Sequence, residues 1–320
     1  MKKVGWLILI VLFIILLVFT AQTYLGYQRD IRVAREQVLA GSQVIETACG
    51  PIEYAISGEG PAVLVVHGAG GGYDQGLEIA RSFVGGGFRF IVPSRFGYLR
   101  TPISTNASAT AQADAYVCLL DALNIRRVAI VGMSAGGPSS MQFALRHPER
   151  SSALVLLVPA AYAPQTRPAP RTPASNFRCQ VIFSSDFTVW LAMKVDRSIF
   201  PLPYCLGIPP SVQTQLTPAE EKQLSEFMQS LLPIMTRLPG LLNDINIYSS
   251  LNRYPLERIT VPTLAISASD DPYNTFISAQ YTAQNIQGAK FIGLKSGGHL
   301  LIGHEEKIRL EVDEFLKQHT

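Results

Sequence analysis

A serine flanked by glycines follows an apolar, β-branched run near the middle of the chain. The run covers residues 128–131 and leads directly into the sequence GMSAG of residues 132–136. A serine on a sharp strand-to-helix turn has a strained backbone, so the positions two before and two after it must be free of side chains. The pattern therefore predicts Ser134 as a nucleophile, with Gly132 and Gly136 as the glycines of its turn.

A serine hydroxyl needs a neighbouring base, and the histidines of the chain are the candidates. His299 follows two glycines and a strand-like run, so a loop can bring its imidazole over the edge of a sheet. His304 is the alternative, but it opens a helix whose apolar residues face inward. His147 fits a helix C-terminus and His319 fits a solvated tail. We therefore assign the base to His299.

The acid that orients the base should lie in a loop between the serine and the histidine. A strand is predicted over residues 261–267, and two adjacent carboxylates follow it, at Asp270 and Asp271. Asp271 precedes Pro272, which holds the loop extended, so we prefer Asp271 as the residue that fixes the tautomer of His299. We expect Asp270 to be solvated or to bond with amides of its own turn.

Two backbone amides should stabilise the oxyanion of the reaction. The first is that of Ala135, the residue after the nucleophile. The second should come from the HGAGGG sequence of residues 67–72, which follows an apolar strand and lets bare backbone approach a carbonyl. We choose Ala69, with Gly70 as the second choice. A phosphate-binding loop is the alternative, but the sequence has neither GK[ST] nor a GxGxxG fingerprint there.

The order Ser134, Asp271, His299, with the HGAGG and GMSAGG sequences, resembles the α/β-hydrolase fold superfamily. The resemblance runs from about Gln43 to the C-terminus and is closest to serine hydrolases with a cap, which include carboxylesterases, carbon–carbon bond hydrolases and cofactor-free perhydrolases. It implies no metal and no organic cofactor. Ser94 departs from the pattern, because many members carry aspartate there. Members with an aspartate nucleophile are disfavoured, because the elbow residue is a serine.

The remaining pattern agrees with an α/β fold. Apolar runs alternate with helical segments, as in a mostly parallel eight-stranded sheet with helices on both faces. The predicted strands lie near Val44, Ile52, Val63, Phe90, Val128, Leu154, Leu264 and Phe291. Helices are predicted over residues 112–123, 136–146, 275–286 and 305–317. We expect the first part of the core at 43–161 and the second at 255–320.

An inserted helical cap is predicted over residues 162–254. Prolines cluster at both ends of its first part, and the segment is rich in large apolar residues. Thr217 and Glu220 form a capping box with proline at the first helical position, which predicts a helix to about Leu232. Cys179 and Cys205 both lie in the cap, and whether they pair depends on an oxidising compartment. The four cysteines lack the spacing of a metal site.

The first 42 residues differ in character from the rest. Residues 4–21 carry no charge, and about 18 such residues reach the lower range for a membrane-crossing helix. Lys2 and Lys3 precede them, which predicts a cytoplasmic N-terminus and a hydrolase domain on the extracytoplasmic side. Residues 22–42 would form a partly helical linker. The alternative is a signal peptide that is removed, leaving a secreted protein.

Together these features predict a membrane-anchored serine hydrolase. The expected substrate is a small ester with an apolar acyl or alcohol part, cleaved through an acyl-enzyme. A carbon–carbon bond hydrolase or perhydrolase with the same three residues is the alternative. An alternative of another class is a non-catalytic binding protein with this fold. The net charge of +3 and the scattered basic residues predict no nucleic-acid partner.

Overall fold

The computed structural model describes residues 2–166 and 172–320, which form an N-terminal helix and a globular unit. Helix α1 (Lys2–Ala40) is continuous, so the segment 22–42, predicted as a partly helical linker, is helical as far as Ala40. The helix has an apolar stretch with a mean hydropathy of 3.1 that is not buried in the protein. By length and composition it could cross a bilayer, and a signal sequence would share these properties.

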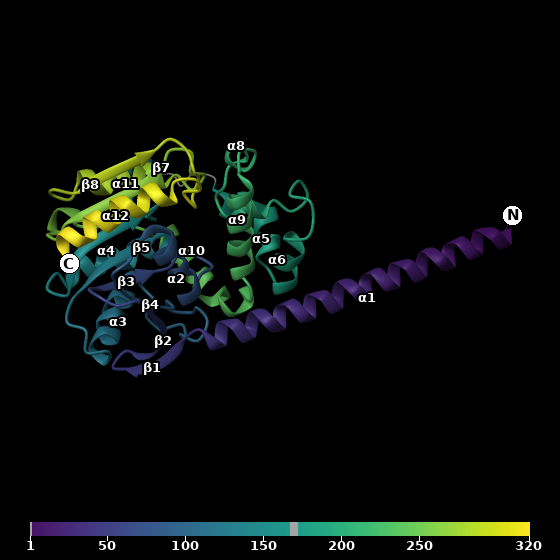
Figure 1. Ribbon diagram of the computed structural model, residues 1–320, viewed down its shortest axis with the longest axis horizontal. Helices are drawn as coiled ribbons and strands as arrows, with labels where there is room; N and C mark the ends of the chain where they lie inside the picture. Colours follow the sequence, from purple (N-terminus) through teal and green to yellow (C-terminus); the bar gives the residue numbers. More distant parts are fainter. Residues whose placement is uncertain (1, 167–171) are drawn as a thin grey trace. The chain divides into compact units, whose positions relative to one another are not determined.

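The globular unit is built on one sheet with the strand order β1-β2-β4-β3-β5-β6-β7-β8 (Figure 1). Strands β1 and β2 run antiparallel to their neighbours, and the others pair in parallel. The predicted mostly parallel, eight-stranded sheet is confirmed, and each predicted apolar run lies on one of its strands. The strands are β1 (Gln43–Thr47), β2 (Gly50–Ser57), β3 (Ala62–Val66), β4 (Arg89–Pro93), β5 (Val128–Met133), β6 (Ser151–Leu157), β7 (Thr263–Ala268) and β8 (Lys290–Leu294).

The central strands carry the core. Every residue of β5, β6 and β7 is buried, so both faces of the sheet are covered there, as their continuous apolar sequences require. Helix α2 contacts α12, and α3 contacts α4. Helix α2 is not among the helices predicted from the sequence. The covering helices are α2 (Tyr73–Phe83), α3 (Ala109–Ala122), α4 (Gly137–Arg146), α11 (Thr275–Gln284) and α12 (Glu305–His319).

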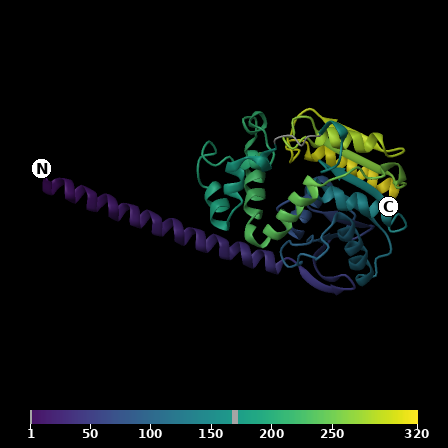
Figure 2. The same ribbon diagram turned by 180° about the vertical axis from the view of Figure 1, so that it is seen from behind.

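A series of short helices separates β6 from β7, and we call this segment the cap. In both views α5 (Phe177–Ile182), α6 (Asp186–Ala192) and α9 (Pro218–Ser230) lie together, to one side of the helices that cover the sheet (Figures 1 and 2). Thr217 and Glu220 form the predicted capping box at the start of α9. Residues 167–171, part of the predicted cap, lie outside the described residues. The longer cap helices are α5 (Phe177–Ile182), α6 (Asp186–Ala192), α9 (Pro218–Ser230) and α10 (Leu238–Ser249). The shorter ones are η2 (Pro164–Thr166), η3 (Pro173–Ser175), α7 (Leu202–Cys205), α8 (Pro210–Gln213) and η4 (Ile234–Thr236), with η5 (Leu256–Arg258) leading into β7.

Two disulfides cross-link the globular unit. Cys179 and Cys205 pair within the cap and join α5 to α7, which resolves the pairing that the sequence left open. Cys49 and Cys118 join the turn after β1 to α3. The second disulfide was not predicted, because the two cysteines are 69 residues apart and the sequence between them indicates no contact.

Candidate active site

Ser134 occupies a tight turn between β5 and α4. It is the first residue of the short helix η1 (Ser134–Gly136), and its φ of 51° lies in the left-handed region. A Cβ at Gly132 would lie 2.3 Å from Ser140 Oγ, and a Cβ at Gly136 would lie 2.7 Å from the carbonyl oxygens of both Val66 and His67. Neither position has room for a side chain, which is the steric reason for both glycines in this turn.

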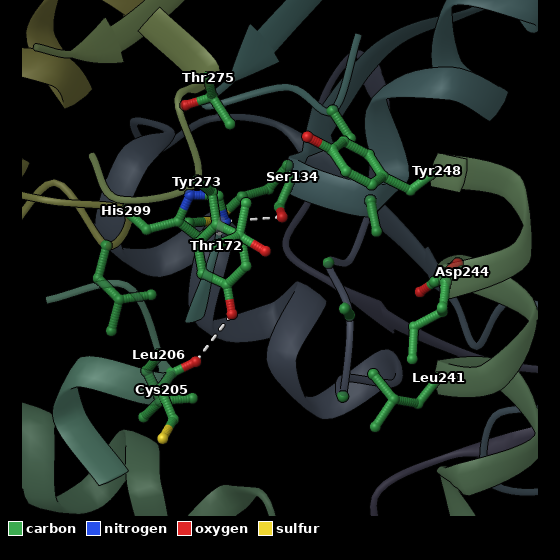
Figure 3. A pocket seen from close by; sticks show the side chains of 18 of the residues that line it. Ser134, Thr172, Cys205, Leu206, Leu241, Asp244, Tyr248, Tyr273, Thr275 and His299 are labelled. Atoms are coloured by element: carbon green, nitrogen blue, oxygen red, sulfur yellow. Dashed lines mark hydrogen bonds between the residues drawn. The ribbon is translucent and has the colours of Figure 1, made fainter. Parts of the chain in front are cut away.

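The structure brings Ser134, His299 and Asp271 into one hydrogen-bonded chain. The Nε2 atom of His299 lies 2.7 Å from Ser134 Oγ (Figure 3). The Nδ1 atom of the same ring lies 2.8 Å from Asp271 Oδ2. The Asp271 side chain is fully buried and also accepts from the Tyr273 amide and the Thr275 hydroxyl. A carboxylate can only accept, so Nδ1 carries the proton and the lone pair of Nε2 faces the serine.

The alternative residues lie elsewhere. Asp270 was expected to be solvated or to bond with amides of its own turn; it is half-exposed, and its carboxylate accepts from the amide of Gly298, in another loop, at 2.9 Å. It thus holds the loop that carries His299. His304 is the N-cap residue of α12 and makes no side-chain cap hydrogen bond. His147 ends α4, as expected, with its Nε2 atom 2.8 Å from Asp114.

The cap contacts both His299 and its neighbour Tyr273 through backbone carbonyls. The backbone amide of His299 donates to the carbonyl of Gly207 at 2.8 Å, and the hydroxyl of Tyr273 donates to the carbonyl of Cys205 at 2.9 Å (Figure 3). The Tyr273 ring lies 4.7 Å from the imidazole ring. Burial raises the pKa of Tyr273, so its hydroxyl remains a neutral donor. These contacts join distant segments and had no signal in the sequence.

The loop after β3 presents its amides unequally. The Gly68 amide donates to Gln75 at 2.8 Å, and the Gly70 amide donates to the hydroxyl of Tyr98 at 3.3 Å. Within the described residues, the Ala69 amide has no acceptor in the chain. The Ala135 amide belongs to the first turn of a helix, where amides lack helical acceptors. Of the two choices made for this loop, Ala69 has the free amide and Gly70 does not.

A buried ion pair lies behind this loop and was not predicted. The Nη1 and Nη2 atoms of Arg95 each lie 2.6 Å from a carboxylate oxygen of Asp244, and each side chain is only 5% exposed. Tyr98 also donates to Asp244. Arg95 donates to the carbonyls of His67 and Gly68, at 3.0 and 3.1 Å. Burial alone would lower the pKa of Arg95, but Asp244 reverses this and raises it, so the arginine stays charged.

His67 is fully buried behind the same loop. Its Nε2 accepts from the backbone amide of Arg95 at 3.0 Å, so its Nδ1 must carry the proton that goes to the carbonyl of Gly68 at 2.7 Å. Burial and the charge of Arg95 lower its pKa well below the ordinary value. His67 is therefore a neutral residue that holds the backbone.

Ser94 stands where many α/β hydrolases carry aspartate, and in this structure it contacts a carboxylate from another strand. The Ser94 side chain is buried and donates to Glu53 at 2.8 Å, and it accepts from the amide of Tyr73 at 3.0 Å. Glu53, on β2, also receives the guanidinium of Arg100 at 2.7 Å. The carboxylate near this loop therefore comes from the neighbouring strand rather than from residue 94.

Ser134 and His299 line a cavity of about 280 Å³ between the sheet and the cap. Figure 3 shows Leu241, Asp244 and Tyr248 projecting from α10 on the other side of this cavity from His299. Among the described residues, the lining includes neither lysine nor arginine, and Asp244 is already paired with Arg95. Nor do three His, Cys, Asp or Glu side chains of the described chain gather as metal ligands would. The other lining side chains are mostly apolar, among them Met133, Phe183, Leu206, Phe227, Leu231 and Ile245.

Comparisons with known proteins agree with this architecture. The family described as alpha/beta hydrolase fold matches residues 61–305. The uncharacterized hydrolase YcgS of Bacillus subtilis (strain 168) is 26% identical over 260 residues, which are 79% of this chain and 89% of that protein. A 2-hydroxy-6-oxo-6-phenylhexa-2,4-dienoate hydrolase of Comamonas testosteroni is 34% identical over 113 residues, or 34% of this chain and 40% of that enzyme.

Solved structures resemble the globular unit over its whole length. An alpha/beta hydrolase fold protein from Nakamurella multipartita superimposes with a TM-score of 0.65 and 28% identity, covering 87% of this chain and 99% of that one. An enol-lactonase from Burkholderia xenovorans LB400 gives the same TM-score at 18% identity, covering 86% of this chain and all of that one. The second likeness concerns the fold alone.

Proposed function

This chain belongs to the alpha/beta hydrolase fold family and is a hydrolase, and from that premise we propose that it cleaves carboxylic esters through a serine acyl-enzyme. The observation that carries the proposal is the hydrogen-bonded chain from Ser134 through His299 to Asp271, which opens into an apolar cavity. Acyl transfer through a serine requires a base beside the hydroxyl and an acid that orients the base, and the order of these three side chains supports that reaction.

In the proposed reaction, Ser134 Oγ attacks the ester carbonyl carbon while His299 Nε2 takes the hydroxyl proton. Asp271, buried and acceptor-only, stabilises the imidazolium that forms. The amides of Ala69 and Ala135 receive the negative charge that develops on the carbonyl oxygen. The imidazolium then donates its proton to the departing alcohol. A water molecule, activated by the same imidazole, hydrolyses the acyl-enzyme and restores the serine.

A carbon–carbon bond hydrolase is the second candidate, because of the local identity to the dienoate hydrolase. The substrate in that enzyme's name is a carboxylate, and a buried carboxylate needs a cationic or multiply donating partner. Among the described lining residues of this cavity, no lysine or arginine would supply one. The mostly apolar lining instead supports an uncharged substrate, and the matched segment spans only 40% of that relative.

The test compares point variants on a panel of p-nitrophenyl esters of increasing acyl length, with the dienoate as the competing substrate. We expect Ser134→Ala to abolish turnover and fluorophosphonate labelling, and Asp271→Asn and His299→Ala each to reduce kcat by about a thousand-fold or more. Asp270→Asn should cost less. Ser211→Ala, at an exposed serine of α8, is the matched control.

Two outcomes would count against the proposal. Labelling that persists in Ser134→Ala would place the nucleophile elsewhere. Turnover of the dienoate that exceeds turnover of every neutral ester would favour the carbon–carbon bond hydrolase instead, with the same serine.

We further propose that α1 anchors the enzyme in a membrane with its globular unit on the extracytoplasmic side. Residues 4–21 carry no charge, and Lys2 and Lys3 precede them. Independent support comes from the two disulfides, since such bonds persist in oxidising compartments and are rare in the cytosol.

This placement is tested on the protein in its native cells. The full chain should stay with membranes through a carbonate wash, because hydrocarbon burial survives such treatment. All four cysteines should resist maleimide until a reductant is added. A mature chain that begins near residue 22 would identify a cleaved signal peptide, and free thiols with protection from external protease would indicate the opposite orientation.

A further inference from the structure

We propose that the cap completes the oxyanion hole, with Asp244 of α10 positioning the Ala69 amide through Arg95 and Tyr98. Neither Arg95 nor Asp244 is assigned a role in the reaction sequence above, and their side chains bond to each other and to the loop of residues 67–72 rather than to Ser134. The inference rests on the proposed function, because it concerns the donor that would stabilise the oxyanion formed on attack by Ser134.

The first step concerns the peptide bond between Gly68 and Ala69. This bond is trans, so the carbonyl of Gly68 and the N–H of Ala69 lie in one plane and point in opposite directions. The carbonyl is held by two donors, Arg95 at 3.1 Å and His67 at 2.7 Å. With the carbonyl directed into the buried side of the loop, the Ala69 amide must face the other side.

The nucleophile lies beside this loop. A Cβ built on Gly68 would stand 3.2 Å from the Cβ of Ser134, so the peptide passes directly next to the serine. Gly68, Ala69 and Ser134 all line the same cavity. A small rotation of the Gly68–Ala69 peptide plane would therefore turn the amide away from the place where the oxyanion forms.

The second step concerns the other peptide bond of Ala69. The amide of Gly70 donates to the Tyr98 hydroxyl at 3.3 Å, and that hydroxyl donates to Asp244. Asp244 thus reaches the peptide before Ala69 through Arg95 and the peptide after Ala69 through Tyr98. One carboxylate therefore contributes to the orientation of both peptide planes that flank the proposed oxyanion donor.

The third step concerns the origin of that carboxylate. Arg95 and Asp244 are 149 residues apart in sequence, and Asp244 belongs to a cap helix whose other side chains, Leu241 and Tyr248, line the cavity (Figure 3). An arginine side chain has many rotamers, and two contacts of 2.6 Å to a carboxylate select one of them. The position of α10 and the orientation of the proposed oxyanion donor are therefore coupled through Arg95, while His67 holds the Gly68 carbonyl from the core.

The experiment uses the full-length enzyme and separates positioning from general loosening. Asp244→Asn keeps the shape of the side chain but removes the charge that holds Arg95, and Arg95→Lys keeps the charge but loses the two-contact geometry. Arg146→Met is the matched control, because Arg146 makes the same two-contact pair with Asp114 on the surface. Because a buried unpaired charge can prevent folding, Tyr98→Phe is included as a milder variant.

Two ketone inhibitors of equal chain length provide the decisive readout. A trifluoromethyl ketone forms a tetrahedral adduct with the serine and needs the oxyanion donor, whereas the methyl ketone remains planar. We expect Asp244→Asn and Arg95→Lys to lower kcat on a neutral ester by about 100-fold, with KM within about three-fold. Affinity for the trifluoromethyl ketone should fall in parallel, and affinity for the methyl ketone should stay unchanged. The kcat of Tyr98→Phe should be about ten-fold lower than that of the wild type. Arg146→Met should resemble the wild type in kcat and in both affinities.

The inference is overturned if a folded Asp244→Asn or Arg95→Lys variant keeps wild-type kcat and trifluoromethyl ketone affinity. It is also overturned if both ketones weaken equally, because that result indicates a loosened cavity rather than a misplaced donor. If no variant of the pair folds, unchanged kcat in Tyr98→Phe has the same consequence. Failure of the proposed function is distinct, since the wild-type enzyme would then neither hydrolyse esters nor bind the trifluoromethyl ketone through Ser134.

Discussion

The two loops of the active site are held in place by different means. The turn that carries Ser134 is held by close backbone packing, since Gly136 lies against the carbonyl oxygens of β3 and its following loop. The loop of residues 67–72 is held by side chains, with Arg95 bonded to two of its carbonyls and Arg237 bonded to the carbonyl of Gly71. The serine turn therefore requires glycine where a side chain would collide with backbone, whereas the loop of residues 67–72 requires charged side chains that bond to its carbonyls.

This difference determines which loop a sequence can reveal. A steric requirement for glycine is local, so it leaves a pattern of fixed spacing around the serine. Long-range ion pairs leave no such pattern, because Arg95 and Asp244 are 149 residues apart and Arg237 and Asp74 are 163 residues apart. The position of Ser134 thus leaves a local pattern in the sequence, whereas the orientation that we propose for the Ala69 amide depends on contacts between distant segments.

The largest effect should follow from a side chain at the serine turn. In Gly136→Ala, the added Cβ would lie 2.7 Å from two backbone carbonyl oxygens, which cannot move as a flexible side chain would. We expect a loss of about 3 kcal/mol in the free energy of unfolding and at least about 100-fold in kcat. Urea unfolding and ester turnover measure both.

The control for this variant is Gly86→Ala, at an exposed glycine whose added Cβ would meet nothing within 4 Å. It should change stability by less than about 0.5 kcal/mol. A Gly136→Ala enzyme as stable and active as the wild type would show that the serine turn yields as readily as a surface loop, and the contrast between the two loops would disappear.

The same contrast explains which features of the fold and of the candidate site could be predicted from the sequence alone. The strands were found because buried parallel strands are continuous apolar runs, and Asp271 was preferred over Asp270 because of the proline that follows it. The roles of Asp270, Tyr273 and Asp244 were not found, since each acts through a partner in another segment. The Cys49–Cys118 disulfide was missed for the same reason. Local sterics and periodicity were readable, and long-range pairing was not.

An intermediate effect should follow from removing the second arginine that contacts the loop of residues 67–72. Arg237 is fully buried and bonds to Asp74 at 2.6 Å and to the carbonyl of Gly71 at 2.7 Å. Arg237→Met should cost about 2 kcal/mol of stability, because charged hydrogen bonds are lost while Asp74 keeps some solvent contact. Its kcat should stay within about three-fold, since the Gly71 carbonyl does not share a peptide bond with Ala69.

Comparison with Asp244→Asn makes this prediction decisive. Both variants break a buried arginine–aspartate pair that holds the same loop, so denaturation curves should show that each is destabilised. Only Asp244→Asn should lose affinity for the trifluoromethyl ketone. Equal losses of kcat in the two variants, measured per folded molecule, would mean that the loop is held as a single body and that Asp244 has no special place in it.

The smallest effect concerns acid and the loop of residues 67–72. Burial and the charge of Arg95 lower the pKa of His67 in the folded enzyme, whereas the unfolded chain has the ordinary value of about 6.5. As the pH falls below 6.5, the His67 imidazole becomes protonated in the unfolded state but stays neutral in the folded state. The free energy of unfolding should therefore decline by up to about 1.4 kcal/mol per pH unit from this residue, with no contribution above pH 6.5.

In ¹⁵N spectra of the folded enzyme at pH 5.5, the His67 ring should remain neutral with its proton on Nδ1, because Nε2 accepts from the Arg95 amide. A doubly protonated His67 ring in the folded state at that pH would contradict the assignment, since Nε2 could then no longer accept the Arg95 amide.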